Sequence, residues 1–337
     1  MKEQNQMKRQ MTRRDFLGYS AAAAAALAIT PRSVFGQIAS RPDSNFNGVQ
    51  IGAITYSYRG MPSTTDDLLN YLIRSGLSSA ELMGGPAEQF AGRPTFERLP
   101  RPQQGEEISD EQRAKLQAAR EAQAEELRAW RLSVSMEKYK ALRQNFNDAG
   151  VNIYIIKFDD IGPNMSEEEV NYCFNAAKAL GARGITTEIS EEKAKFLGPY
   201  ADAHKIMIGF HNHTQINPSS WEGPFSYGEY LGMNFDVGHY VAGTNESPIP
   251  IIEKYAGEGR ILSLHLKDRK VNNGPNMPFG QGDTPLGLIL QLMKKKKWTF
   301  PADIELEYPI PEGSDAVTEV KKCVEYCKNA LADFPVR

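Results

Sequence analysis

The feature that most constrains the fold is a regular alternation along the chain. Eight short runs of β-type composition are separated by stretches with the three- and four-residue apolar spacing of amphipathic helices. Eight such units predict an α/β protein, a (β/α)8 TIM barrel whose parallel strands close into a ring. An open, doubly wound sheet is the alternative, although no glycine-rich phosphate loop follows the first run to support its nucleotide-binding form. The eight runs are 49–57, 78–84, 151–159, 184–190, 205–213, 233–240, 261–268 and 303–309.

A long connection follows the second predicted strand. Residues from about 86 to 132 begin with a segment rich in Pro, Gly and charge, and continue as a charged stretch of strong helical propensity. We therefore expect an enlarged helical connection after strand 2 of the barrel. Two interpretations stay open for it: a solvated helix with a surface loop, or a lid over the mouth of the barrel, because long loops at that end often cover a site.

The N-terminal segment predicts an export signal rather than part of the fold. A basic stretch precedes the apolar run "LGYSAAAAAALAIT", which is short and alanine-rich for a membrane span. The adjacent arginines of "TRRDFLG" resemble the twin-arginine export motif, and small residues favour cleavage just before Gln37. We expect a signal peptide over 1–36, one barrel domain over 37–337, a periplasmic or otherwise extracytoplasmic location, and no stable membrane insertion after cleavage. An uncleaved N-terminal anchor is the alternative.

Charge and cysteine content limit the partners. The formal net charge of -3 gives no general attraction to nucleic acid or to an anionic membrane, so no nucleic-acid partner is expected. The 3 cysteines are too few for a disulfide framework and are expected to be small buried apolar side chains. Cys323 and Cys327 share a predicted helix at a spacing that is poor for a disulfide. A homo-oligomer stays open.

Titratable side chains stand at the C-terminal ends of the last six predicted strands, where barrels of this type build their sites. Side chains alternate along a strand, so the paired residues of one strand share a face. Charged side chains cost less free energy when they point into the barrel than when they are buried beneath amphipathic helices. These residues are therefore expected to converge on the barrel mouth. Imidazoles with carboxylates suit a divalent metal such as Mn, Co, Zn, Mg or Fe(II). The residues are Lys157, Glu188, His211, His213, Asp236, His239, His265, Lys267, Glu305 and Glu307.

The second half of the chain resembles the xylose isomerase-like barrels, which include sugar phosphate isomerases and epimerases, inosose dehydratases and endonuclease IV-type enzymes. The motifs "GFHNHT", "NFDVGH", "SLHLKD" and "IELEYP" carry the resemblance in family order, and it extends loosely over about residues 48–330. It implies that Asp236, His265 and Glu307 are metal ligands. The chain departs from the family at the fifth strand, where epimerases carry a glutamate and this sequence has two histidines.

The resemblance also implies roles for the remaining residues. Either a histidine of "GFHNHT" takes the place of the missing glutamate, or Glu188 reaches over from the fourth strand. The ligand set expected on this basis is Glu188, His213, Asp236, His265 and Glu307. The expected catalytic groups are His213 as the base, Lys157 for developing negative charge, and Glu188. Substrate oxygens are expected to contact His211, His239, Lys267 and Glu305.

The function that follows from the resemblance is enolisation of a sugar. We expect a metal-dependent, isomerase- or epimerase-like enzyme that removes a proton next to the carbonyl of a non-phosphorylated keto-sugar or 3-keto-glycoside, and works as an epimerase or as a lyase or hydratase. The absence of phosphate is expected because the chain is exported. One alternative is a non-catalytic periplasmic sugar-binding protein on the same barrel, with Trp221 and Tyr227 as sugar platforms. Another is an endonuclease IV-type DNA repair enzyme.

Overall fold

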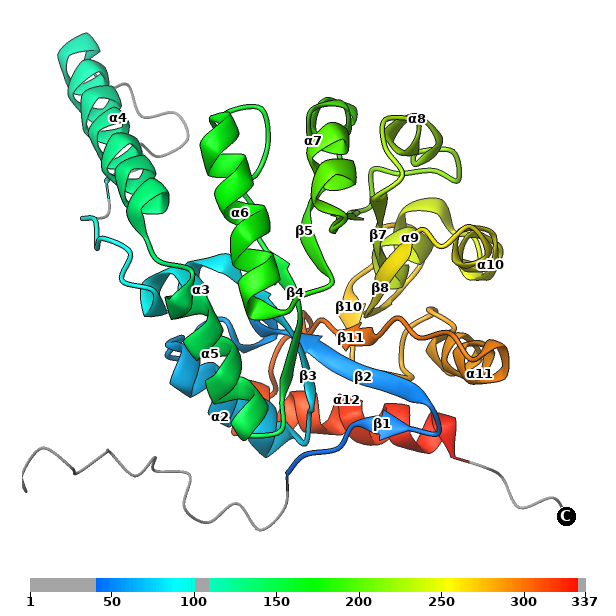
Figure 1. Ribbon diagram of the computed structural model, residues 1–337. Helices are drawn as coiled ribbons and strands as arrows, with labels where there is room; N and C mark the ends of the chain where they lie inside the picture. The colour runs from blue at the N-terminus through cyan, green and yellow to red at the C-terminus, as the bar shows by residue number, and fades with distance from the viewer. Residues whose placement is uncertain (1–40, 98, 101–108, 333–337) are drawn as a thin grey trace, which may run out of the picture. The chain divides into compact units, whose positions relative to one another are not determined.

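The computed structural model describes residues 41–97, 99–100 and 109–332. Within them, eight parallel strands pair in the order β2-β11-β8-β7-β6-β5-β4-β3, and β2 also pairs with β3. This last pairing closes the sheet, which confirms the predicted (β/α)8 TIM barrel (Figure 1). The barrel strands are β2 (Val49–Ile54), β3 (Ser79–Met83), β4 (Asn152–Lys157), β5 (Gly184–Glu188), β6 (Met207–His211), β7 (Leu231–Asp236), β8 (Ile261–Leu266) and β11 (Ala302–Ile304).

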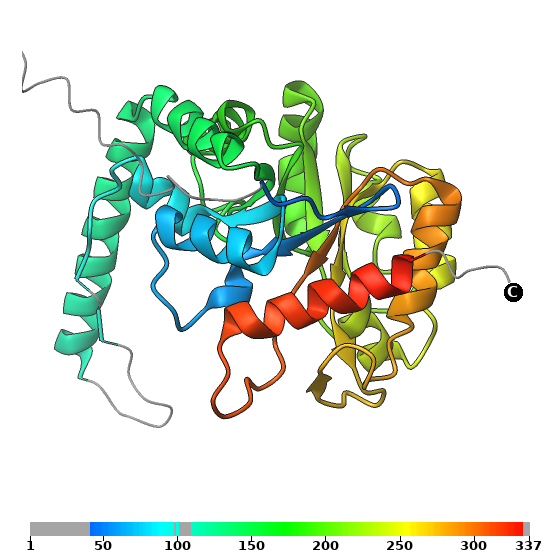
Figure 2. The same ribbon diagram turned by 90° about the horizontal axis from the view of Figure 1, so that it is seen from below.

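Helices surround the ring of strands (Figure 1). The last of them, α12, packs against both α2 and α11, so the first and last strand–helix units of the barrel are neighbours (Figure 2). The helices are η1 (Thr55–Tyr58), α2 (Thr65–Ser75), α3 (Gly84–Phe90), α4 (Asp110–Ser133), α5 (Glu137–Asp148), α6 (Glu167–Leu180), α7 (Glu191–His204), α8 (Glu222–Phe225), α9 (Val237–Thr244), α10 (Ile249–Gly257), α11 (Leu286–Lys296) and α12 (Ala316–Leu331). Three short strands, β1 (Asn45–Phe46), β9 (Asp268–Arg269) and β10 (Asn276–Met277), lie outside the ring.

The strand register sets the level of the polar side chains at the mouth. His211 at the end of β6 pairs with Glu188 on one side and Asn234 on the other. On the next strands, Asp236 of β7 pairs with His265 of β8, which in turn pairs with Asp303 of β11. Because parallel strands in one register bring residues of the same level side by side, side chains far apart in the sequence meet at one end of the barrel.

The connection after β3 contains the expected long helix. α4 begins at a capping box in which Ser109 and Gln112 exchange hydrogen bonds, and it runs for 24 residues. Arg131 is its one buried residue. Most of α4 is thus a solvated helix, which agrees with the first of the two interpretations of this connection.

Arg131 fastens the last turn of α4 to the barrel. Its guanidinium donates to Glu88 of α3 at 2.9 Å and to Asp160 at 2.7 Å, and it lies 3.6 Å from Glu169 of α6. The side chains of Arg131 and Glu88 are 4% and 2% exposed, so this ion pair is shielded from water. Burial lowers the pKa of Arg131, but the carboxylates raise it by more, so the charge is retained.

Trp221, which the sugar-binding alternative uses as a sugar platform, cannot serve as one. Its side chain is completely buried and packs edge-to-face against Phe235, with ring centroids 5.3 Å apart, beside Tyr240 and Tyr255. An aromatic residue in this core position stabilises the packing of α8 and α9 on the barrel and offers no face to a sugar. Tyr227 donates a hydrogen bond to Glu191.

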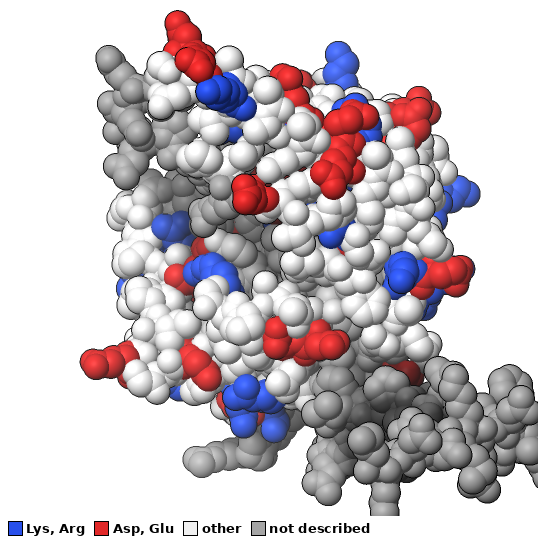
Figure 3. Space-filling model, turned by 90° about the vertical axis from the view of Figure 1, so that its left-hand side faces the viewer, with Lys and Arg blue, Asp and Glu red and all other residues white. Residues whose placement is uncertain are grey.

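The cysteines match their expected character, since all three are free and buried. Among the described residues, no helix is both long and apolar enough to cross a membrane. The expected signal peptide and its cleavage point before Gln37 lie outside the described residues. On the face shown in Figure 3, acidic and basic side chains are intermingled rather than gathered into one basic surface.

We predict that Arg131→Ala lowers the free energy of unfolding by about 3 kcal/mol, because it leaves the buried carboxylate of Glu88 without its closest cation. Lys115→Ala is the matched control on α4: its pair with Glu111 is 76% and 79% exposed and is expected to contribute under about 0.5 kcal/mol. Urea unfolding followed by circular dichroism measures both. Equal, small effects of the two substitutions would show that Arg131 does not fasten the helix.

Candidate active site at the barrel mouth

The predicted strand-end residues do converge at the C-terminal end of the barrel. His265 and Asp236 are fully buried, and His211, Lys267 and Glu305 are nearly so. The inward orientation expected from the alternation of side chains is therefore confirmed for β6, β7, β8 and the segment after β11. A group of charges this deeply buried must be internally compensated, because an isolated buried charge costs several kcal/mol.

Asn234 fixes the protonation of His211. The amide nitrogen of Asn234 lies 2.9 Å from a carboxylate oxygen of Glu81, which only accepts, so the amide oxygen must face His211. That oxygen is 2.9 Å from Nδ1 of His211, which therefore carries the hydrogen. Burial lowers the pKa of His211 to about 4. His211 is consequently neutral near pH 7, with the lone pair of Nε2 turned toward Glu305, 4.0 Å away.

His265 lies between two carboxylates. Its Nε2 is 2.7 Å from Glu81 and its Nδ1 is 2.9 Å from Glu305, so both ring nitrogens donate. Burial opposes the charged form, but the two carboxylates raise the pKa of His265 well above its ordinary value. Burial alone would raise the pKa of Glu81 and of Glu305, but His265 helps to lower both. A histidine whose far nitrogen is held by a carboxylate is the usual arrangement behind a metal-ligating imidazole.

The ammonium of Lys267 lies among three carboxylates. Its Nζ is 2.7 Å from Glu307, 3.1 Å from Glu305 and 3.1 Å from Asp236. Burial lowers the pKa of Lys267, and the three carboxylates raise it by more. Oδ2 of Asp236 nonetheless has no hydrogen-bond partner within the described chain, so its contact with Lys267 is one of charge alone. One buried oxygen here is thus open to a further electrophile.

His239 lies between two cations, and its neutral ring can accept a hydrogen bond from only one of them. Lys267 Nζ lies 2.9 Å from its Nε2, and Arg269 lies 2.8 Å from its Nδ1. Burial first, and then the Lys267 charge, lower the pKa of His239 to about 3. Two adjacent positive charges make His239 a poor place for a metal ion and a suitable contact for an electron-rich substrate oxygen.

The outer part of the mouth is a hydrogen-bonded chain of three residues. Glu188 accepts from Lys157 at 2.9 Å and pairs with Nε2 of His213 at 3.0 Å. His213 follows the end of β6 and its side chain is 54% exposed, so it faces solvent at the mouth. Its hydrogen bond with Glu188 raises the pKa of His213, and that bond together with Lys157 lowers the pKa of Glu188 in spite of burial.

Two groups of side chains have the spacing that a metal ion requires. In one, donor atoms of His211, Asp236, His265 and Glu305 lie within 4.8 Å of one another; in the other, those of His211, His213 and His239 do. The first group has two carboxylates to balance a divalent charge, and it contains the open oxygen of Asp236. It therefore fits a divalent cation such as Mn, Fe(II), Co or Zn. The second has no carboxylate to balance the charge of a divalent ion.

The structure places two of the five predicted ligands in the four-residue group and the other three outside it. Asp236 and His265 belong to the four-residue group, whereas Glu188, His213 and Glu307 lie outside it. His211 and Glu305, which were expected to bind substrate, supply the other two donors of that group. The predicted substrate contacts His239 and Lys267 lie beside it, and Lys157 donates a hydrogen bond to Glu188. We propose His211 as the ligand that takes the place of the glutamate missing from the fifth strand.

Three buried polar residues of the site were not singled out in the sequence: Glu81, Asn234 and Asp303. Each interrupts an apolar strand, and Asn234 and Asp303 precede Asp236 and Glu305 by two residues, on the same face. Strand periodicity could therefore have found Asn234 and Asp303. Burial, followed by the charge of Glu81, raises the pKa of Asp303 to about 8, so it is neutral near pH 7. A Cβ at residue 52 would overlap its carboxylate, which explains the glycine there.

The glycine-rich loop after β8 is held by Asp268. The carboxylate of Asp268 accepts from the backbone of Gly280, Gly282 and Thr284. Asp283 of the same loop bonds to Lys270 and to the backbone of residue 271. The loop geometry is therefore explained by turn chemistry.

Comparison with known proteins gives two family matches. A model described as Xylose isomerase-like TIM barrel matches residues 116–329, and one for the twin-arginine translocation pathway signal matches residues 10–30. The signal directs the protein to the periplasm or another extracytoplasmic space.

Similarity to individual proteins is more distant. L-ribulose-5-phosphate 3-epimerase UlaE of Escherichia coli (strain K12) is 29% identical over 119 residues, or 34% of this chain and 40% of that protein. The chain thus matches less than half of the length of this relative. Two crystal structures share the fold. They are the probable 3-DHS dehydratase AsbF from Bacillus anthracis (TM-score 0.55, 13% identity, 82% of this chain and 98% of that one) and a sugar phosphate isomerase/epimerase from Parabacteroides distasonis ATCC 8503 (TM-score 0.50, 18% identity, 83% and 93%).

We predict that the metal-free protein loses stability as the pH falls from 6.5 toward 4.5. His211 and His239 have folded-state pKa values of about 4 and about 3, below their ordinary 6.5, so in this range the unfolded chain binds protons that the folded chain does not. Each residue then contributes a slope of about 1.4 kcal/mol per pH unit.

Nitrogen-15 NMR of labelled histidines in chelator-treated protein tests this directly. The ring of His211 is expected to stay mostly neutral down to pH 4.5, while that of His213, whose pKa is raised, gains its proton above pH 6.5. Titration of His211 near pH 6.5 would contradict the lowered pKa that burial gives this ring.

Proposed function

Because this chain belongs to the xylose isomerase-like TIM barrel family, we propose that it is a divalent-metal-dependent enzyme that removes a proton next to the carbonyl of a sugar. A carbohydrate-acting enzyme is the broader function supported by its family and by its epimerase and dehydratase relatives. The observation that carries the finer proposal is the buried group of two imidazoles and two carboxylates at the barrel mouth, each imidazole held from behind by a polar side chain.

His211, Asp236, His265 and Glu305 would hold the metal ion. Asn234 and Glu81 orient the two imidazoles, and outer partners of this kind typically change metal affinity by about 10- to 100-fold. Metals bind imidazole that has lost its proton, so loading at His265 requires the release of the one it carries. A divalent cation held there would supply a Lewis acid that polarises the substrate carbonyl and increases the acidity of the adjacent C–H.

The outer residues of the mouth would move the proton. His213 is exposed, adjacent to the metal group, and hydrogen-bonded to Glu188, which keeps its ring oriented. We assign His213 as the base, which is active once it has lost its own proton, and Glu188 as the carboxylate that stabilises the resulting imidazolium. Lys157, on the other side of Glu188, would stabilise negative charge on a substrate oxygen, and His239 and Lys267 would contact further oxygens.

The substrate we propose is a non-phosphorylated keto-sugar or a 3-keto-glycoside. Export places the protein away from the cytoplasm, where most sugar phosphates are found, and this favours a neutral sugar over the phosphate named in the epimerase relative. Removal of a proton next to a carbonyl serves both epimerisation and β-elimination. The proposal therefore includes an epimerase and a lyase or hydratase.

We predict that Asp236→Asn abolishes metal retention. The wild-type protein, incubated with Mn or Zn and desalted, is expected to keep about one equivalent, and the variant under about a tenth, because a ligating carboxylate is lost. Asparagine still caps α9, as Asp236 does through the amide of His239, so the fold is expected to persist. Asp283→Asn removes a carboxylate from the neighbouring loop and is the matched control. Metal analysis by mass spectrometry gives the result, and full retention by the Asp236 variant would exclude the proposed ligand group.

We predict that the metal-loaded protein exchanges a substrate C–H for deuterium. In deuterated water, a panel of 3-keto-glucosides and free ketoses should show solvent exchange next to the carbonyl, detectable by NMR. His213→Gln is expected to slow exchange by about 10²- to 10⁴-fold with unchanged metal content, and to remove the rise in rate with pH that follows deprotonation of His213.

The control for this substitution is His204→Gln, which removes a histidine of α7 that bonds to Asn171 outside the mouth. Wild-type rates in the His213 variant would assign the base elsewhere. Absence of exchange across the whole panel, with metal present, would exclude enolisation.

A further inference from the structure

An exposed tyrosine stands at the rim of the barrel mouth and has no part in the site described above. Tyr56 belongs to η1, the short helix that begins where β2 ends. Its side chain is 40% exposed. Within the described part of the chain, the other large apolar side chains that are this open to solvent are Leu132, Leu288 and Ile310, so Tyr56 is the one aromatic ring among them. Its ring is thus accessible to a ligand.

Hydrogen bonds fix η1 across the ends of two strands. The hydroxyl of Thr55 accepts from the backbone nitrogen of Met83, the last residue of β3, at 3.0 Å. The hydroxyl of Ser57 accepts from the backbone nitrogen of Leu306, just beyond β11, at 3.0 Å. Tyr56 stands between these two anchored residues. It therefore lies at the C-terminal ends of the strands, the end of the barrel that holds the proposed metal ligands.

Arg59 joins the ring of Tyr56 to the segment after β11. The guanidinium carbon of Arg59 lies 4.8 Å from the centre of the ring, and its Nη1 donates to the carbonyl of Leu306. In the chain, Leu306 is flanked by Glu305, a proposed metal ligand, and by Glu307. A cation over an aromatic face makes an attractive contact, which orients the ring. One arginine side chain thus connects the ring to the backbone that carries the site.

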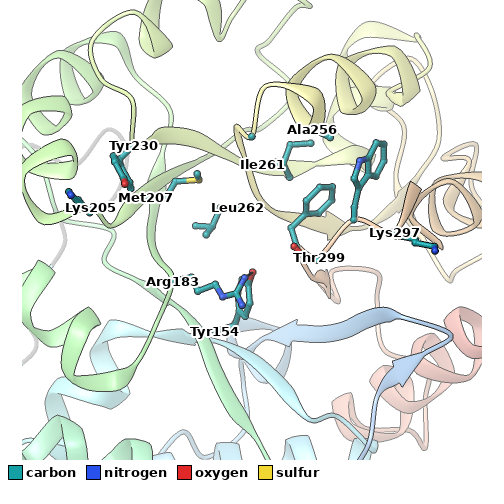
Figure 4. A pocket seen from close by; sticks show the side chains of 13 residues that line it. Tyr154, Arg183, Lys205, Met207, Tyr230, Ala256, Ile261, Leu262, Lys297 and Thr299 are labelled. Atoms are coloured by element: carbon teal, nitrogen blue, oxygen red, sulfur yellow. Dashed lines mark hydrogen bonds between the residues drawn. The ribbon is translucent and has the colours of Figure 1, made fainter. Parts of the chain in front are cut away.

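The rings that line a hollow at the other end of the barrel cannot serve the same site. Tyr154, Tyr230 and Trp298 belong to that hollow, near the beginnings of the strands (Figure 4). At about 3.3 Å per residue, strands of this length separate the hollow from the mouth by more than about 10 Å, even when they are tilted. A ligand at the metal group can therefore contact Tyr56 and not these rings.

The ring of Tyr56 differs in chemistry from the contacts proposed for the reacting sugar. His239 and Lys267 present polar atoms, which suit the oxygens of the sugar that carries the carbonyl. An aromatic ring presents a flat apolar surface, and the apolar C–H face of a sugar ring packs well on such a surface. A ring stacked on Tyr56 stands at the rim rather than among the metal ligands. It therefore belongs to a second unit joined to the reacting sugar.

We propose that Tyr56 binds the second ring of a glycoside whose keto-sugar is held at the metal group. Arg59 orients Tyr56 for this contact. The inference rests on the proposed function, and it narrows the substrate from a free keto-sugar to a 3-keto-glycoside with a ring-shaped second unit. No charge changes at the second ring during the reaction, so the contact stabilises the bound substrate and the transition state alike.

Solvent deuterium exchange by the metal-loaded protein tests the proposal on two probes, methyl 3-keto-glucoside and 3-keto-cellobiose, whose second units are a methyl group and a glucose ring. The wild type is expected to have a KM about tenfold lower for the disaccharide. Tyr56→Leu should raise that KM by about tenfold. It should leave kcat, and both constants for the methyl glucoside, unchanged, because the lost contact binds ground state and transition state equally.

Two further variants separate stacking from a structural role. Tyr56→Phe keeps the ring and should behave as the wild type does. Tyr200→Leu is the matched control, since it removes a tyrosine of α7 that packs against Phe196, and it should change neither KM. All variants are expected to keep the metal content of the wild type.

The outcomes distinguish this inference from the function on which it rests. Equal KM values for the two probes in the wild type, an unchanged KM in Tyr56→Leu, or exchange confined to free ketoses would overturn the role of Tyr56 and leave enolisation intact. Exchange on no sugar, with metal bound, would contradict the proposed function and the role of Tyr56 with it.

Discussion

The arrangement of the barrel mouth depends on the compensation of buried negative charge. Glu81, Asp236 and Glu305 lie inside the barrel, where an unpaired carboxylate would cost several kcal/mol. In the described structure the imidazolium of His265 and the ammonium of Lys267 compensate them. A divalent ion beside the same carboxylates supplies the same kind of compensation, so the charge balance that holds the fold together also defines a metal site.

This balance works because the barrel fixes each group to a rigid strand. His211, Asp236 and His265 belong to three successive strands in one parallel register, and Glu81 reaches His265 from β3. Asn234 joins His211 to Glu81, and His265 bonds to Glu81 directly, so both imidazoles are connected to one carboxylate. Such a network is valuable only when every member is satisfied. One oxygen of Asp236 lacks a hydrogen bond, as do both carboxyl oxygens of Asp303, and the Asp236 oxygen faces the position where chemistry is proposed.

The sequence predicts the barrel well, and also the position of the site at the C-terminal ends of the strands, because both follow from short-range periodicity. Alternation of side chains placed His265 with Lys267 and Glu305 with Glu307 on inward faces, and the structure has them there. The sequence could not decide between His211 and His213, because that choice depends on where β6 ends and on the reach of Asn234 from β7. Trp221 failed as a sugar platform for a related reason: its burial is set by α8, α9 and α10 packing together, which local pattern does not reveal.

Anomalous diffraction from crystals soaked with Mn or Zn would locate a metal ion at the barrel mouth. We expect a single strong peak bounded by His211, Asp236, His265 and Glu305, with Lys267 displaced from the carboxylates that it contacts in the described structure. A peak among His211, His213 and His239, or no peak while Lys267 keeps its place, would contradict this placement of the metal.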